Sequence, residues 1–202
     1  MRTKKVLLKT KFGELTSFNY RPDFNFFEVN QIHGPKIISI QQCSSQNKLV
    51  DADGIFATVK DIPIGPMAIK TADCLPIFIL GEKGVALIHA GWRGLNQKIL
   101  NNTHIEEIIP ISAYLGPAIC VDCYEVSGEF KEYFSEPSSF KMVGQKLHFS
   151  VKVEATRQLT RAFPNIAVSD SSDCTKCLAE LHSFRENKTT ERNYTIFIPK
   201  NS

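Results

Sequence analysis

Long apolar runs are missing from this sequence of 202 residues, and no stretch reaches the 18 or more apolar residues typical of a membrane span. The basic start, residues 1–5, is followed by only three apolar residues before Lys9, too few for a secretory signal. We therefore expect a cytoplasmic protein in a reducing environment. The sequence also lacks a large excess of charge of one sign, because it has 24 Lys and Arg and 21 Asp and Glu. A net charge of +3 argues against nucleic acid or a membrane as the main partner.

Internal repeats, low-complexity tracts and Pro/Gly/Ser-rich linkers are absent from the sequence, so we expect a single domain over residues 1–202. The content of 43% hydrophobic and 22% charged residues is typical of a globular protein and excludes a disordered chain. Neither a P-loop nor a GxGxxG pattern occurs. The sequence carries no signal for an oligomeric state.

Cysteine is present six times, at positions 43, 74, 120, 123, 174 and 177. A chain of this size without an export signal seldom needs disulfides, so metal binding or catalysis is the better interpretation. The pairs Cys120/Cys123 and Cys174/Cys177 have the spacing of a four-thiolate zinc site. However, the 50 residues between the pairs exceed the usual separation, and we interpret these cysteines as buried or incidental.

The hydrophobic pattern predicts an α+β protein. Short runs rich in branched residues, interrupted by Gly, Pro or Asp, predict strands at 37–40, 54–59, 67–70, 75–80 and 85–89. Further strands are expected at 114, 147–149, 166–168 and 194–198. Helical spacing follows Gly91, and Thr103 with Glu106 resembles a capping box. Helices are also expected from Ser127 to Phe134 and from Ser150 to Pro164, where Pro164 ends the second.

Metal-capable side chains lie at the edges of three predicted strands. They are His33 in Asn-Gln-Ile-His-Gly, Cys74 in Thr-Ala-Asp-Cys-Leu-Pro, and His89 in His-Ala-Gly-Trp-Arg-Gly. Two imidazoles and one thiolate form the three-ligand set of a catalytic zinc, which keeps its fourth position for water or substrate. Zinc would hold Cys74 as a thiolate and lower the pKa of a bound water to about 7. Asp73 is a candidate proton acceptor, or a carboxylate that orients a ligand imidazole.

Two alternatives remain open from the residue types. Cys74 could be a metal-free nucleophile with His89 as its base and a carboxylate as the orienting group. The segment 91–94 directly follows a predicted buried strand and opens a helix, so its N–H groups and Arg93 could hold an anion such as phosphate. It could equally be a tight turn with a solvated arginine.

At these segments the chain resembles the laccase-domain family, also called the YfiH-like or multicopper polyphenol oxidase family and now largely described as purine nucleoside phosphorylases. The resemblance spans about residues 30–185 and rests on motifs in the family's order. They are Asn30–Gly34, Asp51–Gly54, Thr71–Pro76, His89–Gly94, Gly116–Ile119, Cys123–Val126, Cys174–Thr175 and His182–Arg185. The most specific are TADCLPI and HAGWRG.

The resemblance implies a layered α/β/β/α sandwich with mixed sheets, similar to a bacterial toxin deamidase (the CNF-toxin/YfiH-like cysteine hydrolase fold). It places the zinc ligands on His33, Cys74 and His89, which is also the set that the residue types favour. It implies phosphorolysis of adenosine, inosine, guanosine or methylthioadenosine, and deamination of adenosine. We expect Cys74, Asp73 and His89 to be catalytic. Substrate or phosphate is expected to contact Arg93, Gln31 and Arg185.

The chain departs from the family pattern at both ends. Members usually begin with a Ser-Thr-Arg-x-Gly-Gly stretch, whereas this chain offers only residues 12–17, so an anion-binding arginine is expected to be missing. The usual paired arginines near the C-terminus are reduced to Arg185-Glu186 and Glu191-Arg192. These differences affect phosphate and substrate contacts, while the metal-capable residues are intact.

Three other functions compete with the nucleoside enzyme. The Cys-His-His set can bind copper, but five histidines are too few for the copper centres of a multicopper laccase that oxidises phenols. Some family members resemble hydrolases that edit peptidoglycan precursors, which also need an activated water. A metal-storing or partner-binding module is disfavoured because storage sites usually close their coordination.

Overall fold

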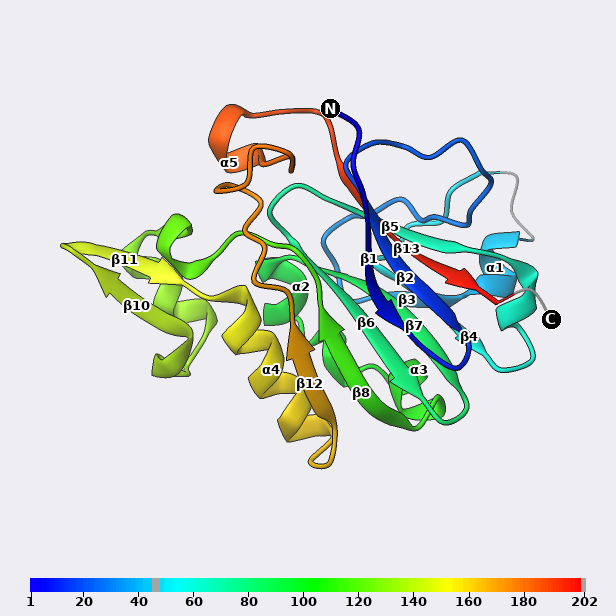
Figure 1. The fold of residues 1–202 in the computed structure, drawn as a ribbon. Helices are drawn as coiled ribbons and strands as arrows, with labels where there is room; N and C mark the ends of the chain where they lie inside the picture. The colour runs from blue at the N-terminus through cyan, green and yellow to red at the C-terminus, as the bar shows by residue number, and fades with distance from the viewer. Residues whose placement is uncertain (45–47, 201–202) are drawn as a thin grey trace.

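The computed structural model describes residues 1–44 and 48–200, which form two packed β-sheets with helices on one side (Figure 1). The larger sheet has six strands in the order β12-β8-β6-β7-β4-β3. Their bounds are β3 (Ile37–Ser39), β4 (Gly54–Thr58), β6 (Leu75–Gly81), β7 (Gly84–Ala90), β8 (Pro110–Leu115) and β12 (Ala167–Asp170). The pairs β3/β4 and β8/β12 are parallel and the other pairs are antiparallel, so the sheet is mixed.

The smaller sheet is antiparallel, with the strand order β1-β2-β13-β5. Its strands are β1 (Lys4–Lys9), β2 (Gly13–Phe18), β5 (Met67–Thr71) and β13 (Asn193–Pro199). Apolar side chains such as Met67 and Phe197 face Phe78 and Leu87 of the larger sheet, and these residues are at most 1% exposed. This contact between the sheets forms one core of the protein. A three-stranded sheet of β9 (Glu125–Val126), β10 (Phe140–Val143) and β11 (Lys146–Phe149) projects to one side (Figure 1).

The strands predicted between residues 37 and 89 are confirmed, with ends that differ by at most one residue. All seven residues of β7 are buried because neighbours pair on both edges and apolar layers cover both faces, which explains its uninterrupted apolar sequence. Strands β1 and β2 were not among the predicted elements. The lysine-rich β1 is an edge strand whose residues are mostly exposed, so it lacks the strong alternation of a half-buried strand.

Helices cover the face of the larger sheet that points away from the smaller one. They are α2 (Trp92–Asn96), α3 (Thr103–Glu107) and α4 (Val151–Ala162), joined by the 3₁₀ turns η2 (Ile99–Asn101), η4 (Gly128–Tyr133) and η5 (Pro137–Ser139). Ser150 caps α4 as predicted, by accepting a hydrogen bond from Val153 N. The capping box at Thr103 is wrong, because the cap of α3 is Asn102, which accepts from His104 N.

The remaining short elements lie in the loops: α1 (Ile40–Ser44), α5 (Phe184–Asn187), η1 (Ile62–Ile64) and η3 (Val121–Cys123). The outer face of the smaller sheet carries Phe18, Ala68 and Ile196, which pack with the loop residues Tyr20 and Phe26. The α+β class with mixed sheets is confirmed, and the toxin-type fold name stays a prediction. None of the helices in the described ranges is long and apolar enough to cross a bilayer.

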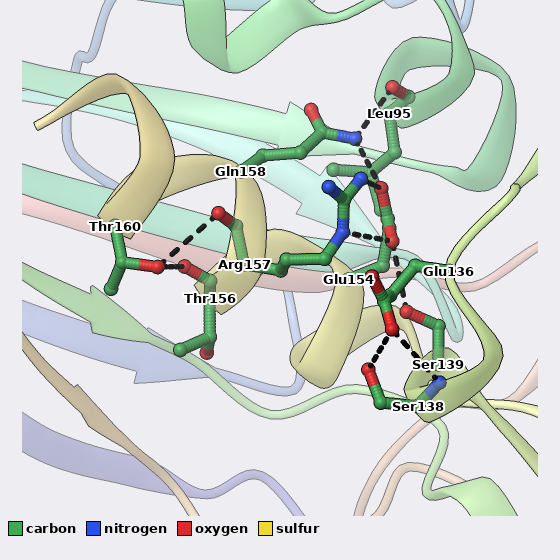
Figure 2. Close-up of polar contacts among 9 residues, drawn as sticks. All are labelled: Leu95, Glu136, Ser138, Ser139, Glu154, Thr156, Arg157, Gln158 and Thr160. Carbon is green, nitrogen blue, oxygen red and sulfur yellow. Dashed lines mark hydrogen bonds and ion pairs between the residues drawn. The ribbon is translucent and has the colours of Figure 1, made fainter.

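A buried carboxylate fastens α4 to the elements around it (Figure 2). Glu154 is 0% exposed and accepts hydrogen bonds from Ser139 Oγ at 2.8 Å, Arg157 Nη2 at 2.6 Å and Gln158 Nε2 at 2.7 Å. Gln158 also donates to the carbonyl of Leu95 at 2.9 Å. Burial raises the pKa of Glu154, but the charge and hydrogen bonds of its partners lower it below the ordinary value. The network holds α4 against α2, the helix that follows Gly91.

Candidate metal centre

Three side chains with metal-capable donors meet at one end of β6 and β7. Cys74 directly precedes β6, His89 is the next-to-last residue of β7, and His33 lies in the loop before β3. Because Pro76 pairs with His89 and Leu75 with Ala90, Cys74 comes to lie beside the end of β7. The three donor atoms lie within 4.8 Å of one another. The structure thus brings together the three residues singled out from the sequence, and their role as metal ligands stays a prediction.

Gly91 leaves the space in which these side chains approach each other. A Cβ at this position would lie 3.2 Å from Cys74 Sγ and 3.2 Å from His33 Cδ2. Ordinary van der Waals contact requires more room, so a larger residue would displace the sulfur or the imidazole. The glycine that opens α2 is therefore also part of the wall of the site.

Asp53, which is 0% exposed, positions two of the three residues. Its carboxylate accepts hydrogen bonds from the backbone N–H groups of Ile32 (3.3 Å), His33 (2.9 Å) and Gly34 (2.7 Å), which fixes the loop that carries His33. Its Oδ1 also lies 2.7 Å from Nδ1 of His89. The other imidazole nitrogen, Nε2, is thereby left for Cys74 or a metal.

Cys74 and His89 shift each other's pKa. Burial raises the pKa of the Cys74 thiol, but the charge of His89 and hydrogen bonds with His33 and His89 lower it to about 6. Burial lowers the pKa of His89, whereas the Cys74 thiolate and the Asp53 carboxylate raise it to about 9. At neutral pH the metal-free pair is therefore a thiolate beside an imidazolium. The thiolate is the form of cysteine that binds metals and attacks electrophiles.

Asp73 directly precedes Cys74 in the chain and has a backbone φ of 93°, while His33 has a φ of 63°. Its Oδ1 accepts from the Thr175 hydroxyl and its Oδ2 from Arg185 N, both at 2.7 Å. The carboxylate that contacts the His89 imidazole is Asp53, so the interpretation of Asp73 as the group that orients it is not supported. Its expected role as a proton acceptor stays a prediction.

A cavity of about 550 Å³ opens beside these residues, within the size range of small-molecule sites. Four cationic side chains line it: Lys70, Arg93, Arg185 and Arg192. Asp73 is the single carboxylate among the lining residues that the structure describes. Lys70 is paired with Glu28 at 2.8 Å, so the three arginines supply the excess of positive charge, which favours an anionic group in the cavity. Both arginines of the reduced C-terminal motif thus reach the cavity wall.

The predicted contact residues take different positions around the cavity. The guanidinium of Arg93 lies over the ring of Trp92 at 4.9 Å, and that of Arg185 lies over Tyr124 at 4.8 Å. The amide of Gln31 is engaged with the backbone of Lys70 in both directions, donating to its carbonyl at 2.7 Å and accepting from its N–H at 2.8 Å. Gln31 therefore holds the cavity wall in place.

Sequence reasoning assigned no role to Asp53 or Thr71. Asp53 stands in one of the motifs that carry the family resemblance, but its contacts with the histidine loop and with His89 require the fold. Thr71 lines the cavity, is 2% exposed, and its hydroxyl has no hydrogen-bond partner among the residues that the structure describes. Buried polar groups without a partner are uncommon in proteins.

The two Cys-x-x-Cys pairs come together, although they are far apart in sequence. The sulfur atoms of Cys120, Cys123, Cys174 and Cys177 all lie within 4.8 Å of one another. The long separation in sequence therefore does not keep the pairs apart, and of the four cysteines expected to be buried or incidental only Cys174 is buried. The chain passes from β8 through α4 to the parallel strand β12, so the loops after β8 and β12 meet at one edge of the sheet.

Comparison with known proteins identifies the family. The family model described as "Multi-copper polyphenol oxidoreductase laccase" matches residues 14–199. A protein named purine nucleoside phosphorylase from Aquifex aeolicus is 36% identical over 173 residues, covering 83% of this chain and 80% of that protein. A prokaryotic protein named adenosine deaminase RL5 is 30% identical over 147 residues, covering 64% of this chain and 54% of that protein.

Solved structures include a similar fold. The protein NMB0706 of Neisseria meningitidis, from the family DUF152, superposes with a TM-score of 0.74 at 26% identity, over 87% of this chain and 75% of that one. The chain therefore belongs to the laccase-domain family, and the resemblance drawn from the motifs is confirmed.

Proposed function

We propose that this protein is a zinc-dependent purine nucleoside phosphorylase that also deaminates adenosine. One observation carries the proposal: the donors of His33, Cys74 and His89, within 4.8 Å of one another, face a cavity of about 550 Å³ with four cationic side chains. Two related proteins are named for these activities. The expected substrates are adenosine, inosine, guanosine and methylthioadenosine. We further infer that it acts in the cytoplasm as a single laccase-like domain, residues 1–202.

The donor set fits a zinc ion. Two imidazole nitrogens and one thiolate are ligands that zinc prefers, and three protein ligands leave a position for water or substrate. Zinc bound there would polarise a substrate oxygen or activate a water. The protein contributes the orientation, because Asp53 fixes Nδ1 of His89 and the backbone N–H of His33. Copper oxidation of phenols is not proposed, because five histidines do not suffice for a multicopper centre.

In phosphorolysis, a phosphate oxygen attacks C1′ of the ribose, and the base leaves with the electron pair of the glycosidic bond. Arg93 and Arg185 hold this phosphate. Their position in the cavity lining and their stacking on Trp92 and Tyr124, which limits their movement, support this role.

In deamination, water attacks C6 of adenosine, Asp73 accepts the proton of the water and returns it to the amino group, and the C6–N bond breaks to release ammonia. Each of its oxygens already accepts one hydrogen bond but retains a second lone pair. The contacts with Thr175 and Arg185 N keep the carboxylate in one orientation during the proton transfer.

The test is chromatography of adenosine and inosine incubated with the full-length protein, with and without phosphate. We expect ribose 1-phosphate and free base only when phosphate is present, and inosine from adenosine in either case. Cys74→Ala and removal of zinc by a chelator should abolish both activities. Unchanged nucleosides under every metal loading would overturn the proposal, and activity that survives complete removal of metal would favour a metal-free Cys74 nucleophile.

Arg93→Ala tests the phosphate contact separately. We expect the KM for phosphate to rise by about tenfold or more, since a charge-assisted hydrogen bond contributes about 1.5–3 kcal/mol. The matched control is Arg161→Ala, which removes an exposed arginine of α4 that does not line the cavity. An unchanged KM for phosphate in the Arg93 variant would exclude this residue from phosphate binding.

A further inference from the structure

A second group of metal-capable side chains is formed by Cys120, Cys123, Cys174 and Cys177, here called the four-cysteine cluster. We propose that the cluster binds one structural zinc ion that fastens two loops of the substrate cavity to each other. The proposal concerns a site separate from His33, Cys74 and His89, and it does not depend on the nucleoside chemistry proposed above.

The spacing of the sulfur atoms fits one tetrahedral ion. All four lie within 4.8 Å of one another, and Cys123 Sγ is 3.4 Å from Cys177 Sγ. A zinc ion with bonds of about 2.3 Å to four thiolates requires sulfur–sulfur distances of about 3.8 Å. A regular tetrahedron with 4.8 Å edges has its centre about 2.9 Å from each corner, which is room for one ion and not for a multi-iron cluster.

A backbone amide contacts the cluster in a way that suits a thiolate. Cys120 N donates to Cys174 Sγ at 3.2 Å. Burial raises the pKa of the Cys174 thiol, but this hydrogen bond lowers it. Hydrogen bonds of this kind stabilise the negative charge of a metal-bound sulfur and hold it in position. All four cysteines are free, and the 3.4 Å contact is well beyond the bond of about 2.05 Å in a disulfide.

The topology explains how two distant pairs form one site. β8 and β12 are parallel neighbours, so the loops that follow them start at the same edge of the sheet. The backbones of the two loops also contact each other directly. Ala118 forms a β-bridge with Cys174, and Thr175 N donates a hydrogen bond to the carbonyl of Ala118 at 3.2 Å. A zinc ion coordinated by both cysteine pairs would link the two loops through metal–sulfur bonds.

The cluster is one residue away from groups that shape the substrate cavity. Ile119, next to Cys120, donates its N–H to the carbonyl of Asp73 at 3.1 Å. Thr175, next to Cys174, donates its hydroxyl to the Asp73 carboxylate at 2.7 Å. Tyr124, next to Cys123, lies under the guanidinium of Arg185. A zinc ion in the cluster would therefore stabilise the wall that carries Asp73 and Arg185 without contacting the substrate.

The experiment is a zinc count, by mass spectrometry, on the full-length protein purified under reducing conditions. Cys177→Ser should hold one zinc fewer per chain than the wild type, because Cys177 is the exposed member of the cluster and its loss leaves three sulfurs. Cys177→His should retain the ion, since zinc accepts a Cys₃His set. The matched control is Cys43→Ser, which removes a cysteine outside both sites and should leave the count unchanged.

Cys74→Ala separates the two sites. If both proposals hold, the wild type binds two zinc ions, each single variant binds one, and the Cys74→Ala/Cys177→Ser double variant binds none. If the proposed catalytic zinc is wrong, the wild type binds one ion that Cys74→Ala retains and Cys177→Ser loses. A count that Cys177→Ser does not lower, or a disulfide within the cluster, overturns the four-cysteine proposal.

Cobalt replacement provides a second readout on the wild type, in case Cys177→Ser does not fold. A four-thiolate cobalt site gives intense sulfur-to-metal charge-transfer absorption, whereas the site at Cys74 supplies one sulfur only. Strong absorption that persists in Cys74→Ala supports the proposal. Absorption that disappears entirely with Cys74 contradicts it, as does iron in place of zinc in the purified protein.

Discussion

Asp53→Asn is the most informative single substitution, because it changes the charge of the positioning group with almost no change in its size. The native carboxylate accepts four hydrogen bonds, from the N–H groups of Ile32, His33 and Gly34 and from Nδ1 of His89. An asparagine at this position has one oxygen, which accepts about two of these bonds. Its NH₂ group must face the remaining donors.

The size of the effect follows from this count. Two donors left without an acceptor at about 1–3 kcal/mol each lower the free energy of unfolding by about 2–6 kcal/mol. The free imidazole no longer has its Nδ1 held by a charged acceptor, so its Nε2 is less well directed. Loss of such a supporting group typically lowers metal affinity by about 10- to 100-fold. We expect the Asp53→Asn variant to show both losses.

Two measurements test this prediction at pH 7. Urea unfolding gives the free energy of unfolding. Competition with a chromophoric chelator gives the zinc affinity of the site at Cys74, which is identified as the site that Cys74→Ala loses. Asp51→Asn is the control, since Asp51 is an exposed carboxylate in the same segment whose contact with Asn30 an amide oxygen can keep. If Asp53→Asn binds zinc within twofold of the wild type, Asp53 does not position His89 for a metal.

Two further substitutions test the geometry and the pH response. Gly91→Ala should lower zinc affinity at least tenfold, because the added Cβ would lie 3.2 Å from the Cys74 sulfur. The control is Gly128→Ala, whose added Cβ would have nothing within 4 Å and which should bind zinc as the wild type does. Equal zinc affinities of the two variants would refute this steric explanation. Glu154→Gln should lower the Tm at pH 7, since its contact with Arg157 loses a buried charge, an effect of about 1–3 kcal/mol. The lowered pKa of Glu154 stabilises the fold above the ordinary value of 4.5, and this contribution is lost as the pH falls through the folded-state pKa. The difference in Tm from the wild type should therefore shrink below about pH 4.5, and a constant difference from pH 7 to pH 3 would contradict this origin.

The sequence predicts the central strands and the residues of the candidate metal centre for different reasons. Runs such as Val85–His89 are strongly apolar because β7 is buried on both faces, so the hydrophobic pattern predicts these strands directly. Cys74 precedes β6 and His89 lies near the end of β7, and the short connection between these two strands brings the residues together. His33 comes from a distant loop, and it was grouped with the other two by its metal-capable residue type beside a predicted strand and by the family motif.

The four-cysteine cluster shows where sequence reasoning stops. Its pairs are separated by a crossover that contains α4, and chain distance is a poor guide to spatial distance across parallel strands. The role of Asp53 was missed for a similar reason, since hydrogen bonds to a loop some 20 residues away leave no local pattern. The capping residue of α3 was predicted one residue too late. Asn102 is as good an N-cap residue as Thr103, and the helix begins directly after Asn102.

The positive φ angles of His33 and Asp73 limit which substitutions can stabilise this protein without removing its reactive groups. Conformations of this kind in residues other than glycine cost about 1–3 kcal/mol each and persist only where the surrounding structure enforces them. Glycine would relax both positions but would remove the imidazole and the carboxylate. The domain thus gives up thermodynamic stability at two points to keep reactive groups there, and variants selected for heat resistance alone should acquire glycine at these positions and lose their chemistry.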